Sequence, residues 1–220
     1  MGDEVELPGA YSLKPTGDDP ELAHSWEFTG HATAKYTNGD VFVGDYVEGK
    51  KHGKGTYTYL NGDVFEGAYS GDKRTGIGQM TYADGSFYSG HFADGARDGE
   101  GTFVYPTKDI YSGGWKAGKK SGTGFYVFAG SKYYYHGTWK NGEIVTGKWV
   151  LSPSRHFEGS FSRQKPFGEG KFVCAGYEVY GEYSQEVKPL DSGEGVGGAP
   201  PMKTATMWET YGMEKLEAGA

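Results

Sequence analysis

The chain has 220 residues, a formal net charge of −7 and a single cysteine, Cys174. The acidic balance argues against nucleic acid or an anionic membrane as a partner, and a lone cysteine excludes an internal disulfide, which favours a reducing compartment. No apolar run approaches the roughly 20 residues of a membrane-spanning helix, and the acidic start lacks the apolar core of a signal peptide. We therefore expect a cytoplasmic protein. Its 39 glycines and 16% aromatic residues indicate many short strands and tight turns.

Residues 1–25 are expected to form an N-terminal extension. Gly2 invites comparison with an N-myristoylation motif, but that motif requires Ser or Thr at the sixth position, where this chain has Glu6. The stretch 33–41 aligns with the second half of the repeat that follows it, and we interpret it as a partial copy. The repeats are therefore expected to begin at about residue 26.

Copies of an aromatic-x-Gly-x-aromatic motif follow, and the first four are 23 residues apart. The six full units begin at Phe42, Phe65, Tyr88, Tyr111, Tyr135 and Phe157, and their central glycines are Gly44, Gly67, Gly90, Gly113, Gly137 and Gly159. The second half of a unit carries a Gly-x-Gly pair, an alternating stretch and a turn such as Asn61-Gly62-Asp63. The fifth unit departs from this pattern and has only Gly147 near that place. A partial copy at 179–183 ends the array, which we place at residues 26–184.

The alternation of residue types predicts strands. In an extended strand alternate residues share a face, so Phe42, Gly44 and Tyr46 are expected on one side of a sheet. The glycine leaves space there for a ring from a neighbouring strand. The polar stretch 48–52 is interpreted as a turn, so each unit is a hairpin with its connector, and consecutive hairpins must stack to bury their rings. The predicted fold is all-β, an elongated single-layer antiparallel β-meander.

Basic residues recur at the same place in successive units, at the tips of the predicted hairpins. They are Lys50, Lys51, Lys73, Arg74, Arg97, Lys119 and Lys120, and the opposite turns carry Asp40, Asp63, Asp84 and Asp109. Solvated loop charge is one interpretation. The other is a strip with a basic and an acidic edge that fixes orientation in an assembly. On the second interpretation the basic residues are candidate protein-interaction residues.

Residues 185–220 differ from the repeats. The Gly/Pro-rich stretch 193–201 is interpreted as a flexible linker, and the segment after it concentrates Met207, Trp208 and Tyr211. Such residues are unusual in a disordered tail, and when exposed they indicate a contact. We expect this tail to dock onto a partner chain with Trp208 as its anchor, because large aromatic residues dominate interface energies. The alternative is that the tail folds back and caps the last hairpin of its own sheet.

No catalytic, cofactor-binding or metal-binding residues are predicted. The stretch 142–148 resembles a phosphate-binding loop, but Trp149 stands where that loop needs Ser or Thr to bind magnesium. The glycine-rich stretch 193–198 lies in the linker, and the six histidines lack the spacing of metal ligands. Cys174 is interpreted as a small apolar side chain rather than a nucleophile. The sequence therefore indicates a structural protein rather than an enzyme.

The repeat resembles the MORN motif, in which aromatic-x-Gly-x-aromatic is followed by a turn, Gly-x-Gly-x-Tyr-x-Tyr and Asn/Asp-Gly. A finer resemblance is to the MORN-type radial spoke head proteins of ciliary and flagellar axonemes. It rests on residues 130–133, 137–142, 155–159, 166–172 and 180–183. The start of the chain also resembles these proteins, with an acidic lead and a degraded first unit before Asn38-Gly39-Asp40, but the tail after about Tyr183 does not. This resemblance implies a scaffold in the axoneme of motile cilia, part of the cytoskeleton, that contacts other radial spoke head proteins and faces the central pair apparatus.

Other functions remain open at this point. MORN arrays in other families have been proposed to bind membranes, so a peripheral phospholipid-binding module is one alternative, supported by the basic tips and opposed by the net charge of −7. An adaptor for a separate enzyme is another, because the repeats leave no room for a catalytic domain. Pairing with a second copy, as a homo-dimer, or with a paralogue is also compatible with the sequence.

Overall fold

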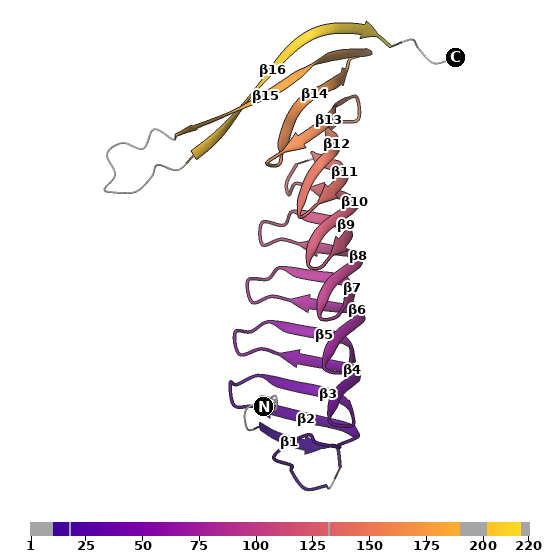
Figure 1. Ribbon diagram of the computed structural model, residues 1–220, viewed down its shortest axis with the longest axis vertical. Helices are drawn as coiled ribbons and strands as arrows, with labels where there is room; N and C mark the ends of the chain where they lie inside the picture. Colours follow the sequence, from indigo (N-terminus) through magenta and orange to yellow (C-terminus); the bar gives the residue numbers. More distant parts are fainter. Residues whose placement is uncertain (1–10, 18, 132, 190–201, 217–220) are drawn as a thin grey trace, which may run out of the picture. The chain divides into compact units, whose positions relative to one another are not determined.

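The computed structural model describes residues 11–17, 19–131, 133–189 and 202–216, and this part of the chain contains sixteen β-strands and no helix. The order of the strands in the sheet is their order in the sequence, and neighbouring strands run antiparallel (Figure 1). The predicted all-β antiparallel meander is confirmed.

The strands fall into two compact units, residues 1–119 and 120–220. The first unit contains β1 (Tyr11–Pro15), β2 (Gly30–Tyr36), β3 (Val41–Val47), β4 (Lys50–Thr58), β5 (Val64–Ser70), β6 (Lys73–Thr81), β7 (Phe87–Ala93), β8 (Ala96–Val104) and β9 (Ile110–Lys116). The second contains β10 (Lys119–Val127), whose first residue closes the first unit, then β11 (Tyr134–Lys140), β12 (Glu143–Ser152), β13 (Arg155–Ser162), β14 (Lys165–Cys174), β15 (Tyr177–Pro189) and β16 (Met202–Lys215). Both units are built from the same kind of hairpin.

Two-residue turns join the two strands of a hairpin. Between β3 and β4 the turn is Glu48 and Gly49, with φ of 48° and 80°, and Val47 pairs with Lys50 across it. Two successive positive φ values are typical of the type I′ turn, whose twist suits a hairpin. The predicted turn over 48–52 is therefore too long, because residues 50–52 already belong to β4.

The two glycines of each Gly-x-Gly pair serve different purposes. Opposite β3 the register moves from Gly44–Gly55 to Asp45–His52, so β4 has extra residues at this point and bulges. Gly53 has a φ of 63° within this bulge, a conformation that side chains disfavour. At Gly55 the demand is space, because a Cβ there would lie 2.5 Å from ring atoms of Phe42.

Buried rings cover one side of the sheet. This aromatic face consists of Phe42, Tyr46, Phe65, Tyr69, Tyr88, Phe92, Tyr111, Trp115, Tyr135, Trp139, Phe157 and Phe161. The rings meet edge to face: the Phe42 centroid lies 5.4 Å from that of Tyr46 and 5.1 Å from that of Tyr69 in the next repeat. Such contacts are worth about 0.5–1.5 kcal/mol each beyond the burial of area. The repeats are therefore joined by side-chain contacts as well as by strand pairing.

The ring above a central glycine comes from the glycine's own strand. A Cβ on Gly44 would lie 2.6 Å from the Cζ atom of Phe42, two residues earlier, so the expectation of a ring from a neighbouring strand is wrong here. The same arrangement occurs at Gly67, Gly90 and Gly159. Gly137 differs, because its Cβ would instead meet the backbone of Thr146 and Gly147. Gly113 pairs with Gly101 across β8 and β9.

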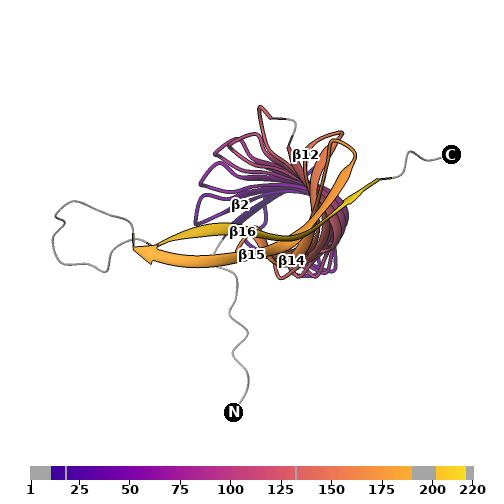
Figure 2. The same ribbon diagram turned by 90° about the horizontal axis from the view of Figure 1, so that it is seen from above.

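The sheet extends beyond the repeats at both ends. Within the expected N-terminal extension, Tyr11–Pro15 forms β1 and pairs with β2. At the other end β15 continues past residue 184 to Pro189, and the tail forms β16, which lies beside β15 in both views (Figures 1 and 2). The linker predicted at 193–201 lies outside the described residues.

Candidate protein-interaction surface

The predicted basic tips divide into two groups. Lys50, Lys73 and Lys119 are the first residues of β4, β6 and β10, and their side chains are exposed. Lys51, Arg74 and Lys120 come one residue later in these strands and are partly buried, because successive side chains of a strand point to opposite faces. Arg97, the second residue of β8, is also partly buried. The interpretation of all seven as solvated loop charges is therefore wrong for these four.

The four inward cations lie over the aromatic face. The guanidinium carbon of Arg97 is 4.4 Å from the ring centroid of Trp115, and its Nη2 donates a hydrogen bond of 2.9 Å to the carbonyl of Gly118. Arg74 makes the equivalent hydrogen bond to the carbonyl of Gly95, one repeat earlier. The Lys51 ammonium lies within 5.6 Å of three ring centroids. Lys51, Arg74 and Arg97 thus stabilise the sheet through cation–π contacts, and the two arginines do so through backbone hydrogen bonds as well.

Lys120 is the inward cation at the tip between β9 and β10. Its Nζ lies 4.3 Å from the Trp139 ring centroid and 5.0 Å from that of Tyr126. Burial lowers the pKa of Lys120 to about 8, and the nearby charge of Glu143 only partly opposes this. Lys119, its neighbour in the strand, is exposed. One tip therefore holds one lysine with a structural role and one that faces solvent.

Carboxylates accompany the basic tips. Lys73 forms an ion pair of 3.0 Å with Asp94 of the next turn, and Lys51 lies 3.8 Å from Asp72 in the same relation. The backbone N–H of Lys51 also donates to Asp72, at 2.9 Å. The predicted basic edge is therefore an edge of mixed charge. Sequence reasoning missed Asp72 and Asp94, although each stands 21 residues after its lysine.

The acidic turns on the opposite edge connect successive repeats. The Asp40 carboxylate accepts hydrogen bonds from the backbone N–H of Leu60 and from the Tyr57 hydroxyl, both at 2.8 Å, and from Asn38 at 2.9 Å. Burial alone would raise the pKa of Asp40, but these hydrogen bonds outweigh it and lower the pKa below its ordinary value. Asp63 repeats the link to the next turn by accepting from Ala83 at 2.9 Å. Part of the predicted acidic edge thus has a structural role.

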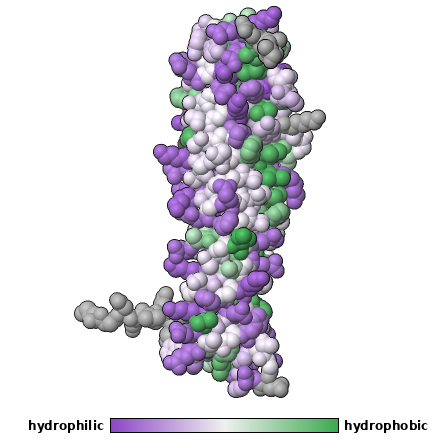
Figure 3. All heavy atoms as spheres, turned by 90° about the vertical axis from the view of Figure 1, so that its right-hand side faces the viewer, coloured by the Kyte–Doolittle hydropathy of each residue, from purple (hydrophilic) through white to green (hydrophobic). Residues whose placement is uncertain are grey.

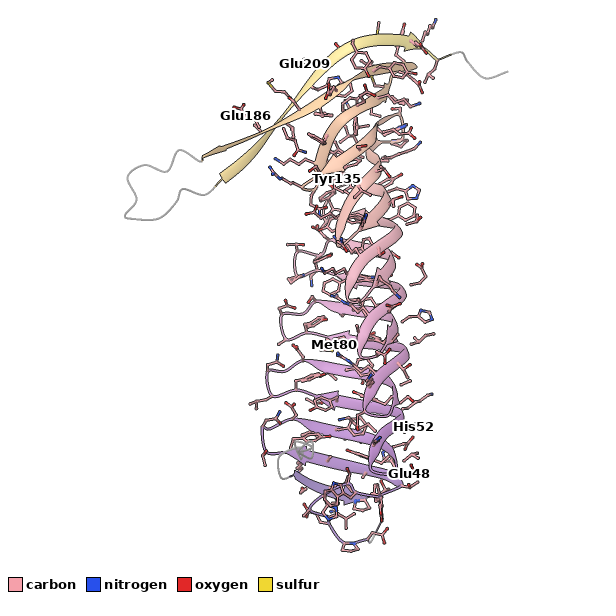
Figure 4. The ribbon with its side chains drawn as sticks, in the orientation of Figure 1. Glu48, His52, Met80, Tyr135, Glu186 and Glu209 are labelled. Carbon is pink, nitrogen blue, oxygen red and sulfur yellow. The ribbon has the colours of Figure 1, made fainter. Side chains whose placement is uncertain are left out.

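A hollow of about 290 Å³ lies between the tips and the tyrosines of the first unit. Its wall consists of Lys51, Tyr57, Tyr59, Tyr69, Asp72, Lys73, Arg74 and Gly95. Phenol rings beside ammonium and guanidinium groups suit an extended segment that carries carboxylates. Figure 4 labels Met80 of β6 and Tyr135 of β11, two other buried residues of the sheet.

The tail residues point in different directions. Trp208 packs on its own chain, with ring centroids 4.9 Å from Tyr183 and 5.3 Å from Phe172. This is the arrangement of the capping alternative, and it removes Trp208 as a free anchor. Met207 and Tyr211 stay 60% and 66% exposed and remain candidates for contact with a partner. Figure 4 marks the tail at Glu209, with Glu186 on the adjacent strand.

Two further findings concern chemistry. Within the described residues, no three His, Cys, Asp or Glu side chains come together in a way that could hold a metal ion. The same part of the chain has no helix with the length and apolar character needed to cross a membrane.

Comparison with known families gives one match. The model of the MORN repeat matches residues 42–64, 65–87, 88–110, 111–131, 135–145 and 157–179. The matches begin at the same residues as the six sequence motifs, and the shortest one falls on the unit that lacks the Gly-x-Gly pair. A search of the curated proteins found no match. Because the six matches together cover more than half of its residues, the chain belongs to the MORN-repeat family.

Proposed function

We propose that this chain is a non-catalytic scaffold that makes protein–protein contacts through its hairpin tips. One observation carries the proposal: Lys50, Lys73 and Lys119 occupy equivalent exposed positions, each directly after a two-residue turn. Buried rings and inward cations fix the strands behind these positions. A scaffold needs such a rigid series of similar contacts, because it gains orientation from the spacing as well as from each contact.

The finer proposal places this scaffold in the radial spoke head of motile cilia and flagella, where it links the spoke to the central pair apparatus. It rests on the resemblance of residues 130–183 to MORN-type spoke head proteins. The direct partners would be other spoke head proteins. Their complementary surface would carry carboxylates for the exposed lysines and ammonium or guanidinium groups for the accompanying aspartates.

Both the general scaffold proposal and the spoke head proposal can be tested by expressing the chain in a motile ciliated cell that lacks its own copy. The tagged wild-type chain should localise along the axoneme and restore normal beating. The variant Lys50→Glu/Lys73→Glu/Lys119→Glu should fold but enter the spoke head several-fold less efficiently. The control Lys14→Glu/Lys35→Glu/Lys54→Glu makes the same change in net charge at exposed lysines away from the tips, and it should assemble normally. Absence of the wild-type chain from axonemes would refute the spoke head location. Equal assembly of both variants would refute the proposed role of the hairpin tips in protein contacts.

Phospholipid binding is the second candidate, and its support is weaker than the sequence indicated. Four of the seven basic residues face the rings, and Lys73 forms an ion pair with Asp94. Co-sedimentation with vesicles that contain phosphatidylserine tests it directly. Binding that the tip variant loses, without any axonemal localisation, would favour the membrane over the scaffold. An adaptor role would instead require that the enzyme co-purifies with the chain whose hairpin tips are intact.

A further inference from the structure

The turn between β12 and β13 carries a short sequence that occurs nowhere else in the chain. Figure 3 shows small hydrophobic groups dispersed among hydrophilic ones on the face it displays, so no broad apolar area there marks a ligand site. The turn reads Ser152-Pro153-Ser154-Arg155, and proline directly follows a serine or threonine at this place alone. Proline-directed protein kinases require that dipeptide, because their substrate groove suits a residue that lacks a backbone N–H. Many of them also favour a basic residue three positions after the acceptor, and this chain has Arg155 there.

The side chains of this turn are accessible. Pro153, Ser154 and Arg155 are exposed, and Ser152 is partly exposed. The hydroxyl oxygens of Ser152 and Ser154 lie 3.5 Å apart at the surface. An enzyme can therefore approach the Ser152 hydroxyl from solvent.

A single strand pair closes this end of the hairpin. Ser152 is opposite Arg155, but the register shifts between Val150 and Ser152. The shift leaves Leu151 without a partner in β13. Such an end can open locally while the rest of the sheet stays paired. A kinase that binds its substrate as an extended segment needs only this opening.

The geometry of the turn also favours opening. Neither Pro153 nor Ser154 has a positive φ, whereas Glu48 and Gly49 of the turn between β3 and β4 both do. The turn after β12 therefore lacks the type I′ geometry whose twist suits a hairpin. The two strands are held less firmly here than at the tips described above.

Arg155 is the residue that a phosphate on Ser152 would meet. Directly opposite residues of an antiparallel pair have Cβ atoms about 4.5–5.5 Å apart, so the guanidinium can reach the phosphate. None of the ion pairs among the described residues involves Arg155. The pairing continues from Arg155 to Cys174, Tyr177 and Lys215, and none of these is a carboxylate. The phosphate would gain a charge-assisted partner without repulsion from its own row.

We propose that the folded chain is phosphorylated at Ser152 by a proline-directed protein kinase, and that Arg155 then binds the phosphate. The γ-phosphoryl group of ATP passes to the Ser152 oxygen. A new O–P bond forms, the bond from the γ-phosphorus to the bridging oxygen of ADP breaks, and the hydroxyl proton goes to the base of the kinase.

The modification would reverse the charge of this turn. The turns that lead into β3, β5, β7 and β9 carry the aspartates named above, whereas the turn into β13 carries Arg155. A phosphate of about −2 charge outweighs the single guanidinium and makes this turn acidic as well. A partner surface that suits one charge state would not suit the other. The inference does not depend on the spoke head.

Phosphorylation of the purified full chain tests the site. A kinase that requires Ser/Thr-Pro with a basic residue three positions later should add one phosphoryl group, which mass spectrometry should locate on Ser152. Ser152→Ala should accept none, and Ser152→Thr should accept one because it keeps a hydroxyl before Pro153. The matched control Ser154→Ala removes the neighbouring hydroxyl and should be phosphorylated like the wild type. Equal incorporation into Ser152→Ala would overturn the inference, as would phosphorylation of a synthetic peptide of residues 148–159 but not of the folded chain.

Phosphorus NMR tests the role of Arg155. A guanidinium beside the phosphate favours its doubly charged form, so the second pKa of the phosphoserine should lie below its ordinary value of about 6. Arg155→Ala, phosphorylated to completion with excess kinase, should raise this pKa towards the ordinary value. Arg163→Ala removes an exposed arginine from the next turn and should leave the pKa unchanged. The same pKa in the wild type and in Arg155→Ala would overturn the assignment of Arg155 as the phosphate's partner.

Discussion

At the scale of single residues, glycine is needed for two different physical reasons, which the sequence alone does not distinguish. Gly49 and Gly53 have positive φ, whereas Gly55 and Gly90 lie where a Cβ would strike a ring or the backbone of the facing strand. Replacement of the first kind strains the backbone, and replacement of the second kind forces strands apart. The second kind should be the more costly.

Gly90→Ala tests this expectation. The added Cβ would meet the Cα of Gly101, and it would lie 2.6 Å from the carbonyl oxygen of Glu100 and from the Tyr88 hydroxyl. Backbone atoms cannot move aside without breaking strand pairs, so we expect a loss of about 2–3 kcal/mol in the free energy of unfolding. Gly212→Ala is the matched control, because its nearest neighbour would be the Tyr180 Cβ at 3.8 Å. Urea denaturation should show little change for the control; equal losses would contradict the explanation.

Lys120 gives a prediction about pH. Its pKa of about 8 lies below the ordinary 10.5, so between these values the folded chain holds fewer protons than the unfolded chain. The free energy of unfolding should therefore rise from pH 8 towards 10, by about 1 kcal/mol after allowance for solvent screening. Lys120→Met should remove this rise, whereas Lys119→Met, at an exposed position, should keep it. Thermal unfolding at pH 7.5 and pH 9.5 measures the difference, and an unchanged slope in Lys120→Met would refute the assignment.

At the scale of elements, turns in neighbouring repeats are joined by aspartates. Asp40 and Asp63 both accept the backbone N–H of a residue in the following turn, but only Asp40 also accepts a tyrosine hydroxyl. Met80 stands one repeat after Tyr57 and has no hydroxyl to donate. The link made by Asp40 therefore includes a tyrosine hydroxyl that the link made by Asp63 lacks, and it should be the stronger of the two.

Removal of each aspartate should reveal this difference. Asp40→Ala leaves the Leu60 N–H and the Tyr57 hydroxyl without this acceptor, and we expect a loss of about 2–3 kcal/mol, against about 1 kcal/mol for Asp63→Ala. Because the pKa of Asp40 is lowered on folding, its contribution is present above pH 4 and is lost as the pH falls further. The gap between wild type and Asp40→Ala should therefore narrow in acid. A gap that stays constant down to pH 2 would contradict the role of the carboxylate.

The tail strand provides a second prediction at this scale. Trp208 covers Gly181 and contacts Tyr183 and Phe172, whereas Tyr211 is 66% exposed. Trp208→Ala should therefore cost about 3 kcal/mol in the isolated chain, and Tyr211→Ala about 0.5 kcal/mol or less. Chemical denaturation at low protein concentration measures both without a contribution from association. Equal stability of the two variants would show that β16 does not hold the end of the sheet.

At the scale of the whole molecule, the sequence predicted the fold because the repeats report the same alternation many times. The orientation of the tips could not be obtained in this way. With the turn assumed to run to His52, Lys50 and Lys51 look equivalent; once β4 begins at Lys50, they face opposite sides. The sequence did not show whether the tail docks onto a partner or forms the last strand of its own sheet, because the same composition suits both. What decides between them is the register that places Trp208 beside Tyr183, with its ring over Gly181.

The order of the strands has a consequence for how this chain can form and change. Each described strand pairs only with the strand before it and the strand after it in the sequence. During synthesis, therefore, no strand needs a partner from a distant part of the sequence, so the sheet can grow from any completed hairpin. A stretch such as 65–87 begins and ends at the same point of the repeat, and its loss would bring Val64 before Tyr88 just as it now precedes Phe65. The number of repeats can thus change over evolution in steps of 23 residues, because the strands on either side of a lost repeat would meet equivalent partners.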